Sequence, residues 1–140
     1  MIRIILLVIT LGFAFSADTD THLAKEEPRK DRLNLFQYEK LVKDMIYKIN
    51  RLNSELKYVK DEKTAKRTVA NIKRLLGQLT ALTEKMQKLP PPSPKVQKEL
   101  SEKYDSKMKA SVEEFSGLIV GLQGKEYASE ILFLISPLEN

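Results

Sequence analysis

Charged side chains are the main residues of this chain that could do chemistry, because Cys is absent and His22 is the only His. The absence of Cys excludes disulfides, thiolate metal sites and thiol nucleophiles. His22 lies in a polar stretch ahead of any periodic segment, so we expect a solvated residue and not a ligand or a base. No Glu-x-x-His pattern of a di-iron helical bundle occurs. We therefore predict no catalytic residue, no metal site, no cofactor and no enzymatic activity.

The carboxylates have the spacing of a solvated helix surface. Several are followed four residues later by Lys, and such pairs add about 0.2–0.5 kcal/mol each on a helix. Glu113 and Glu114 are adjacent, so on a helix they point about 100° apart and do not form a two-carboxylate catalytic site. The spaced pairs are Glu39 and Lys43, Asp44 and Lys48, Glu62 and Lys66, Glu84 and Lys88, and Glu99 and Lys103.

Net charge is the property with a functional implication. The chain has 24 Lys and Arg against 19 Asp and Glu, a formal net charge of +5, and the cations concentrate at residues 60–74. This segment predicts a face that an anionic partner contacts; a solvated charged face without a partner is the alternative. Nucleic acid is not expected as that partner, since no aromatic residue is interleaved with the cations. The predicted face consists of Lys60, Lys63, Lys66, Arg67, Lys73 and Arg74.

Apolar residues that recur at spacings of three and four predict the helices that must position these charges. The first segment has a heptad repeat, typical of a coiled coil, and predicts a helix over residues 34–59. Its apolar residues are Leu35, Tyr38, Val42, Met45, Ile49, Leu52, Leu56 and Val59.

Two further segments have the same periodicity. Asp61 is placed to cap a helix over residues 62–88. Ser93 followed by Pro94 is typical of the start of another helix, which we expect over residues 94–123, with Gly124 at its C-terminal cap. The proline-rich residues 89–94 between them predict a stiff connector; a polyproline ligand for an aromatic groove is the alternative.

The apolar residues 126–136 are too short to span a bilayer and predict a short helix that closes the bundle, although periodicity alone does not distinguish it from a strand. The predicted fold is therefore all-α, an antiparallel bundle of three long helices plus a short C-terminal helix. We expect one domain over residues 34–138.

The first residues resemble a secretory signal peptide. Arg3 supplies a positive charge, residues 4–15 are almost entirely apolar, and Ala14 and Ser16 are small residues at the positions that a signal peptidase reads. We expect residues 1–16 to be removed after Ser16, residues 17–33 to form a disordered leader, and the product to be periplasmic or extracellular. A retained membrane anchor is the alternative; the mature chain should have no transmembrane segment.

The chain resembles a loosely defined family of small exported all-helical bacterial proteins of unknown function. The resemblance covers about residues 56–122 and implies a bacterial source, but no activity. It rests on Val59-Lys60-Asp61, Thr64-Ala65, Leu89-Pro90, Pro92-Ser93-Pro94, Leu100, Lys103-Tyr104 and Met108.

Together these features predict a non-enzymatic exported helical interaction or scaffold protein, with a protein partner or self-association. The alternative is a peripheral binder of an anionic membrane surface, or of another polyanion, through the basic face of the second helix. A small hydrophobic ligand between the helices is a further possibility that the sequence leaves open.

Overall fold

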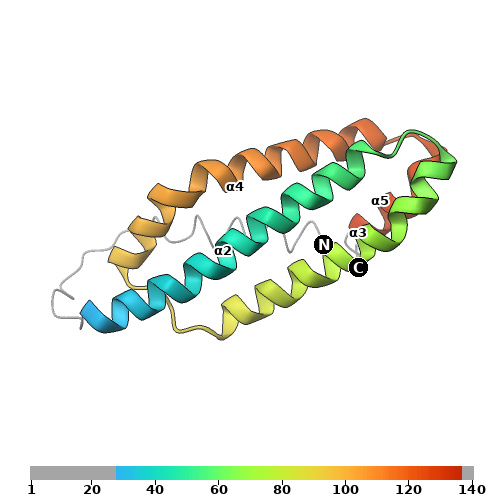
Figure 1. Cartoon of the computed structure of the whole chain (residues 1–140). Helices are drawn as coiled ribbons and strands as arrows, with labels where there is room; N and C mark the ends of the chain where they lie inside the picture. Colours follow the sequence, from blue (N-terminus) through green and yellow to red (C-terminus); the bar gives the residue numbers. More distant parts are fainter. Residues whose placement is uncertain (1–27, 137–140) are drawn as a thin grey trace.

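The computed structural model describes residues 28–136. They form α2 (Pro28–Lys57), α3 (Glu62–Lys88), α4 (Pro94–Leu122), the 3-10 turn η2 (Glu126–Ala128) and α5 (Ser129–Ile135) (Figure 1). The described range contains no strand, so the prediction of an all-α fold with three long helices and a short C-terminal helix is confirmed. The predicted signal peptide, the predicted leader up to residue 27, and residues 137 and 138 of the predicted domain lie outside the described residues.

The predicted bounds are accurate for the later helices and wrong for the first. Helix α2 begins at Pro28 and ends at Lys57, so residues 28–33, predicted as leader, are helical. Pro28 suits the first turn of a helix, where its missing N–H is not needed, and Asp31 favours the positive end of the helix dipole. The prediction missed this start because residues 28–33 have no apolar periodicity. Residues 126–135 are helical, first as η2 and then as α5, and no strand forms there.

Helix α2 is the central element of the fold. Helices α3 and α4 each pack against α2, whereas η2 and α5 pack against α3. Consecutive long helices run in opposite directions, and α2 lies between α4 and α3 in Figure 1. The inward side of α2 carries Met45, Ile49, Leu52 and Leu56, none of which is more than 2% exposed. Because burial of each such side chain contributes about 1.5–3 kcal/mol, this stripe is a main source of stability.

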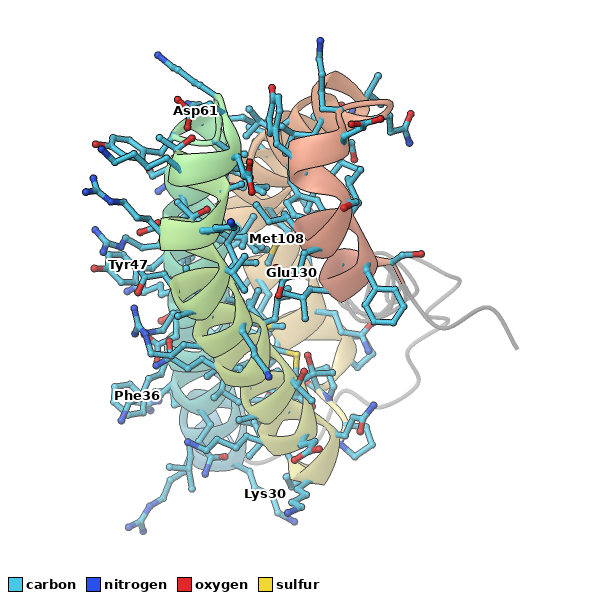
Figure 2. All side chains as sticks on the ribbon, turned by 90° about the vertical axis from the view of Figure 1, so that its right-hand side faces the viewer. Lys30, Phe36, Tyr47, Asp61, Met108 and Glu130 are labelled. Carbon is cyan, nitrogen blue, oxygen red and sulfur yellow. The ribbon has the colours of Figure 1, made fainter. Side chains whose placement is uncertain are left out.

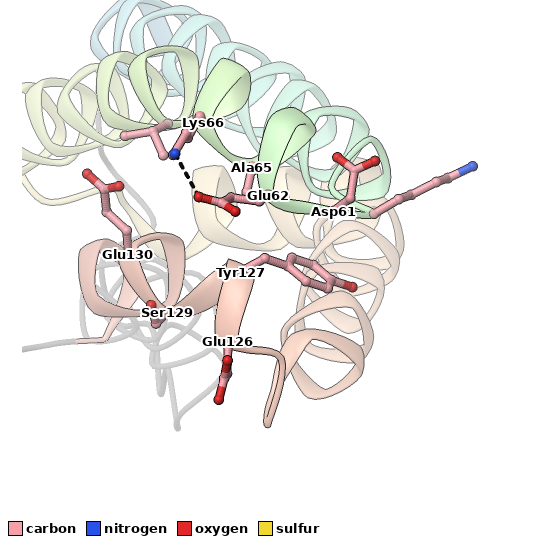
Figure 3. Close-up of a pocket in the computed structure, with 10 residues that line it drawn as sticks. Asp61, Glu62, Ala65, Lys66, Glu126, Tyr127, Ser129 and Glu130 are labelled. Carbon is pink, nitrogen blue, oxygen red and sulfur yellow. Dashed lines mark ion pairs between the residues drawn. The ribbon is translucent and has the colours of Figure 1, made fainter.

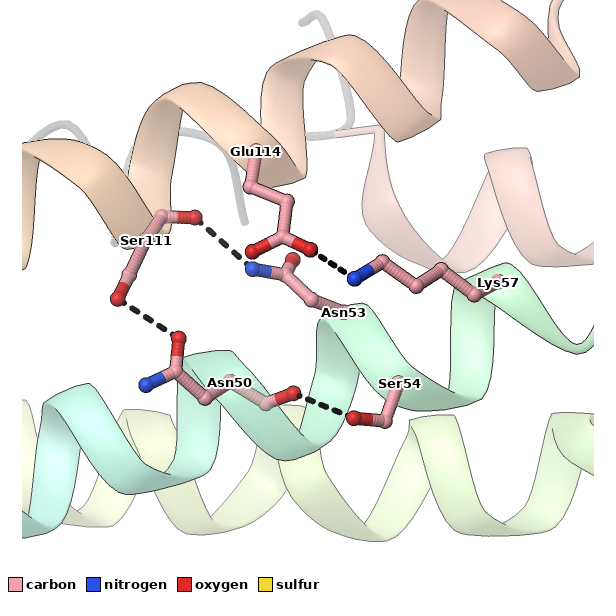
Figure 4. Close-up of polar contacts among 6 residues, drawn as sticks. All are labelled: Asn50, Asn53, Ser54, Lys57, Ser111 and Glu114. Carbon is pink, nitrogen blue, oxygen red and sulfur yellow. Dashed lines mark hydrogen bonds and ion pairs between the residues drawn. The ribbon is translucent and has the colours of Figure 1, made fainter.

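Polar contacts set the position of α4 along α2 (Figure 4). The Asn53 side-chain amide, 1% exposed, donates to the Ser111 carbonyl oxygen at 2.9 Å. The Ser111 hydroxyl donates to Asn50 Oδ1 at 2.7 Å, and Lys57 forms an ion pair with Glu114. If α4 slid along α2, the buried Asn53 amide would lose its acceptor. This hydrogen bond therefore favours one alignment of the two helices.

A second ion pair links the other halves of the same two helices. Glu39 pairs with Lys103 of α4 at 2.8 Å, and this contact is the main cause that lowers the pKa of Glu39 and raises that of Lys103. The sequence had suggested partners for both residues within their own helices. Of the five expected pairs within a helix, Glu62 with Lys66 is formed, at 2.7 Å.

The connections between helices have the predicted caps. Asp61 accepts from the Thr64 backbone N–H at 2.8 Å, and the Asp61 N–H donates to the Thr64 hydroxyl at 3.0 Å. Ser93 accepts from the Val96 N–H at 3.3 Å, with Pro94 in the first helical position. The exception follows α4, where the C-terminal cap is Gln123 and not the predicted Gly124. Gly124, with a φ of 79°, is the third residue of a type II turn, which the Lys125 N–H closes by donating to the Leu122 carbonyl oxygen at 3.2 Å.

The proline-rich connector is bound to the first half of α2. Asn34 and Tyr38 both donate side-chain hydrogen bonds to the Pro90 carbonyl oxygen, at 3.2 and 3.0 Å. Two donors from consecutive turns of one helix fix the place where the chain turns from α3 to α4. The connector therefore acts as a structural brace across one end of the bundle.

We predict that Asn53→Ala lowers the free energy of unfolding by about 1–2 kcal/mol in urea denaturation, because it removes a buried hydrogen bond and leaves a small void. Ser111→Ala is the matched control. It removes only the bond to Asn50, which water can replace because Asn50 is exposed, so its cost should be below about 1 kcal/mol. Equal costs for the two variants would contradict a register set by Asn53.

The Asp61 cap predicts a loss of stability in acid. Hydrogen bonds from Thr64 lower the pKa of the Asp61 carboxyl, so its contribution is complete above the ordinary aspartate pKa and is lost as pH falls through the lowered value. Asp61→Asn keeps a good cap without the charge, and thermal unfolding should show a smaller acid-induced decrease in Tm than in the parent chain. Asp61→Ala should lower Tm at all pH values. Parallel pH profiles for the parent and Asp61→Asn would contradict this.

Candidate functional site

The structure divides the predicted basic face into an outward group, on the side of α3 opposite its buried residues, and an inward group beside a hollow. All six of its residues are exposed. Lys63, Arg67 and Arg74 lie on the side of α3 opposite its buried residues, as their spacing of four and seven requires. Lys60 and Lys66 instead line a hollow at the start of α3. Lys73 follows Lys66 by two turns and so lies on the same side of the helix as Lys66.

The outward group is longer than the sequence analysis had predicted. Lys85 and Lys88, in the last turn of α3, fall within the same arc of about 60° around the helix axis. Between Lys63 and Lys88, the same side of the helix also carries the small exposed residues Ala70, Gly77 and Ala81. We call the outward group the α3 cation row: Lys63, Arg67, Arg74, Lys85 and Lys88.

The α3 cation row is free of ion pairs. Within residues 28–136, none of its five members forms a salt bridge, whereas the ion pairs present there involve other cations. At a rise of about 1.5 Å per residue the row spans about 37 Å along the helix. A line of unpaired cations of this length produces a positive potential over the outer surface of α3.

The inward group shares a hollow with carboxylates of the C-terminal segment, and Figure 3 shows Lys66 on the side of Glu130. The hollow has a volume of about 580 Å³ and lies between the first turns of α3 and the η2–α5 segment. Its charged lining comprises two cations, Lys60 and Lys66, and four acids, so we call it the acid-rich hollow. The acids are Asp61, Glu62, Glu126 and Glu130.

Lys66 shows how this hollow changes the predicted face. Figure 3 shows its ammonium group between Glu62 of α3 and Glu130 of α5. The ion pair with Glu62 is the main cause that raises the pKa of Lys66, and the charge of Glu130 adds to it. An anion at Lys66 would therefore compete with two carboxylates of the chain itself. The sequence analysis missed this because Glu130 lies 64 residues further along the chain.

Neither group of the predicted basic face lies beside a candidate metal site within the described residues. No cluster of three or more His, Cys, Asp or Glu side chains suited to a metal ion occurs between residues 28 and 136. His22, the only His, lies outside the described residues. What the α3 cation row can do chemically is attract and bind an anion.

Among the described helices, none combines the length and the apolar character that a membrane span needs. No protein-family model matches the chain, and no curated protein or solved structure matches it. The function of the chain is therefore inferred from its own geometry.

Proposed function

We propose that this chain is a non-enzymatic, exported interaction protein that holds an anionic partner on the α3 cation row. One observation carries the proposal: five cations follow one face of α3, and none is paired with an acid within the described residues. A solvated helix surface commonly alternates charges of both signs, which partly neutralise each other. The row instead keeps its charge available to a partner.

The packing of α2 supports a partner on the outside of the bundle. The heptad stripe of α2, which would suit a coiled-coil dimer, is occupied by α3 and α4. A protein partner, or a second copy of the chain, would therefore contact the outer faces. The outer face of α3 carries the α3 cation row, and its charge favours an anionic partner.

Export is part of the proposal. Its support is the order of Arg3, the apolar residues 4–15 and the small residues Ala14 and Ser16, which is the layout that a signal peptidase recognises. Cleavage after Ser16 would release a product that begins at Ala17 and works in the periplasm or outside the cell.

Charge reversal in the row tests the proposal. The double variant Arg67→Glu with Arg74→Glu should elute from a heparin column at clearly lower salt than the parent chain, because the column is a polyanion and retention depends on cations that contact it. The chain is expressed from Met1 and purified as the cell leaves it. Intact mass spectrometry of each preparation checks for Ala17 at the N-terminus.

The matched control is Lys98→Glu with Lys109→Glu on α4. It changes the net charge by the same amount, but both lysines already lie within 4.0 Å of an acid of their own helix. The control should elute close to the parent chain. Equal shifts for the two double variants would show that retention follows total charge and would overturn a site on α3.

A further inference from the structure

The outer face of α2 carries exposed aromatic rings that neither the core nor the α3 cation row uses. Phe36 is 65% exposed, Tyr47 57% and Tyr58 61%. They are spaced by eleven residues, about three helical turns, so they follow one line with a drift of about 20° per step. Tyr58 directly follows the last residue of α2, in a turn where its N–H donates to the Glu55 carbonyl oxygen at 3.1 Å.

Cations flank these rings at helical spacing. Arg32 and Lys40 lie one turn before and after Phe36, and Lys43 and Arg51 lie one turn before and after Tyr47. None of the four forms an ion pair within the described residues. We call this set the α2 aromatic stripe: Arg32, Phe36, Lys40, Lys43, Tyr47, Arg51 and Tyr58.

The stripe projects away from the bundle. Figure 2 shows Phe36 and Tyr47 on the same side of the molecule, both pointing away from the other helices. Of the nearest acids of α2, Glu39 is bound to Lys103 of α4, whereas Glu55 accepts only a neutral amide hydrogen bond, from Asn71 of α3 at 3.4 Å, and keeps its charge. Asp44 and Glu55 are the remaining acids beside the stripe, against four cations in it.

We propose that the α2 aromatic stripe binds the surface of an anionic lipid bilayer, with α2 lying parallel to the membrane. Phe and Tyr rings are well placed at the level of the lipid headgroups, and Lys and Arg bind the lipid phosphates beside them. Phe36 and Tyr47 lie on one side of α2, about 17 Å apart along its axis, so both rings can meet a plane at once.

A second copy of the chain fits the stripe poorly. In a symmetric dimer the same patch meets itself, so four cations of one copy would face four of the other. Like charges across an interface are unfavourable. The charge of the stripe therefore favours an anionic surface over self-association at this face.

The inference goes beyond the proposed function, since it uses a different helix and different residues. The charge-reversal variant of α3 leaves the α2 aromatic stripe intact, whereas the ring substitutions in the stripe leave every cation in place. Either result can fail without the other.

The absence of Trp from the chain allows a direct test by fluorescence. Phe36→Trp places a single reporter in the stripe, and Phe133→Trp places one at an exposed ring of α5, 71% exposed, as the matched control. Full chains are mixed with vesicles of phosphatidylcholine alone or with added phosphatidylglycerol. We expect the emission of Phe36→Trp to shift to shorter wavelength with the anionic vesicles only, and that of Phe133→Trp to stay unchanged.

A co-sedimentation assay with the same vesicles measures affinity. Phe36→Ser with Tyr47→Ser should weaken binding by about tenfold or more, since each ring would bury apolar area at the membrane, whereas Phe133→Ser should not. All variants share the same N-terminal segment, so its contribution cancels. Circular dichroism checks that each variant keeps its helices.

Three results would overturn the inference: unchanged vesicle binding in the double Ser variant, equal binding to neutral vesicles, or an emission shift confined to Phe133→Trp. Retention of the chain on immobilised polyglutamate through the stripe, without vesicle binding, would also overturn it. That result would assign the stripe to an acidic protein partner.

Discussion

The buried apolar stripe of α2 is the constraint on which the rest of the structure depends. Met45, Ile49, Leu52 and Leu56 are almost completely buried, and α3 and α4 both pack on α2, while few residues of α3 and α4 contact each other directly. A disturbance of α2 therefore disturbs both main interfaces, whereas α5 depends on α3. Because the inner side of α2 is fully used for packing, partners are left with the outer faces of the bundle.

Helices α2 and α3 each have one residue pattern on the inner face and another on the outer face, with different physical roles. The inner pattern of α2 has spacings of three and four, which keep one narrow face toward two neighbours. Its outer pattern repeats every eleven residues and alternates cations with rings at Phe36, Tyr47 and Tyr58. On α3 the outer face carries cations separated by small residues. The inner patterns give stability, and the outer patterns set the charge and the apolar character of the exposed surface.

The fold could be predicted from the sequence where local physics decides it. The bounds of α3 and the caps at Asp61 and Ser93 follow from neighbouring residues. The start of α2 at Pro28 could not be predicted from apolar spacing. Contacts between distant residues were also beyond reach: nothing near Asn53 indicates Ser111, and nothing near Lys66 indicates Glu130. For the same reason the sequence did not show that Lys60 and Lys66 line a hollow with acids of the C-terminal segment, or that Lys85 and Lys88 lie in line with Lys63, Arg67 and Arg74.

Hydrogen exchange measured by NMR on the full chain tests most directly the claim that α2 is the centre of the fold. Amides of residues 45–56 should exchange most slowly, with opening free energies near that of global unfolding, because opening α2 breaks both main interfaces. Amides of α5 should exchange faster, since this helix packs only on α3 and η2 to any extent. Exchange of the α2 amides that is faster than that of both α3 and α4 would contradict the account.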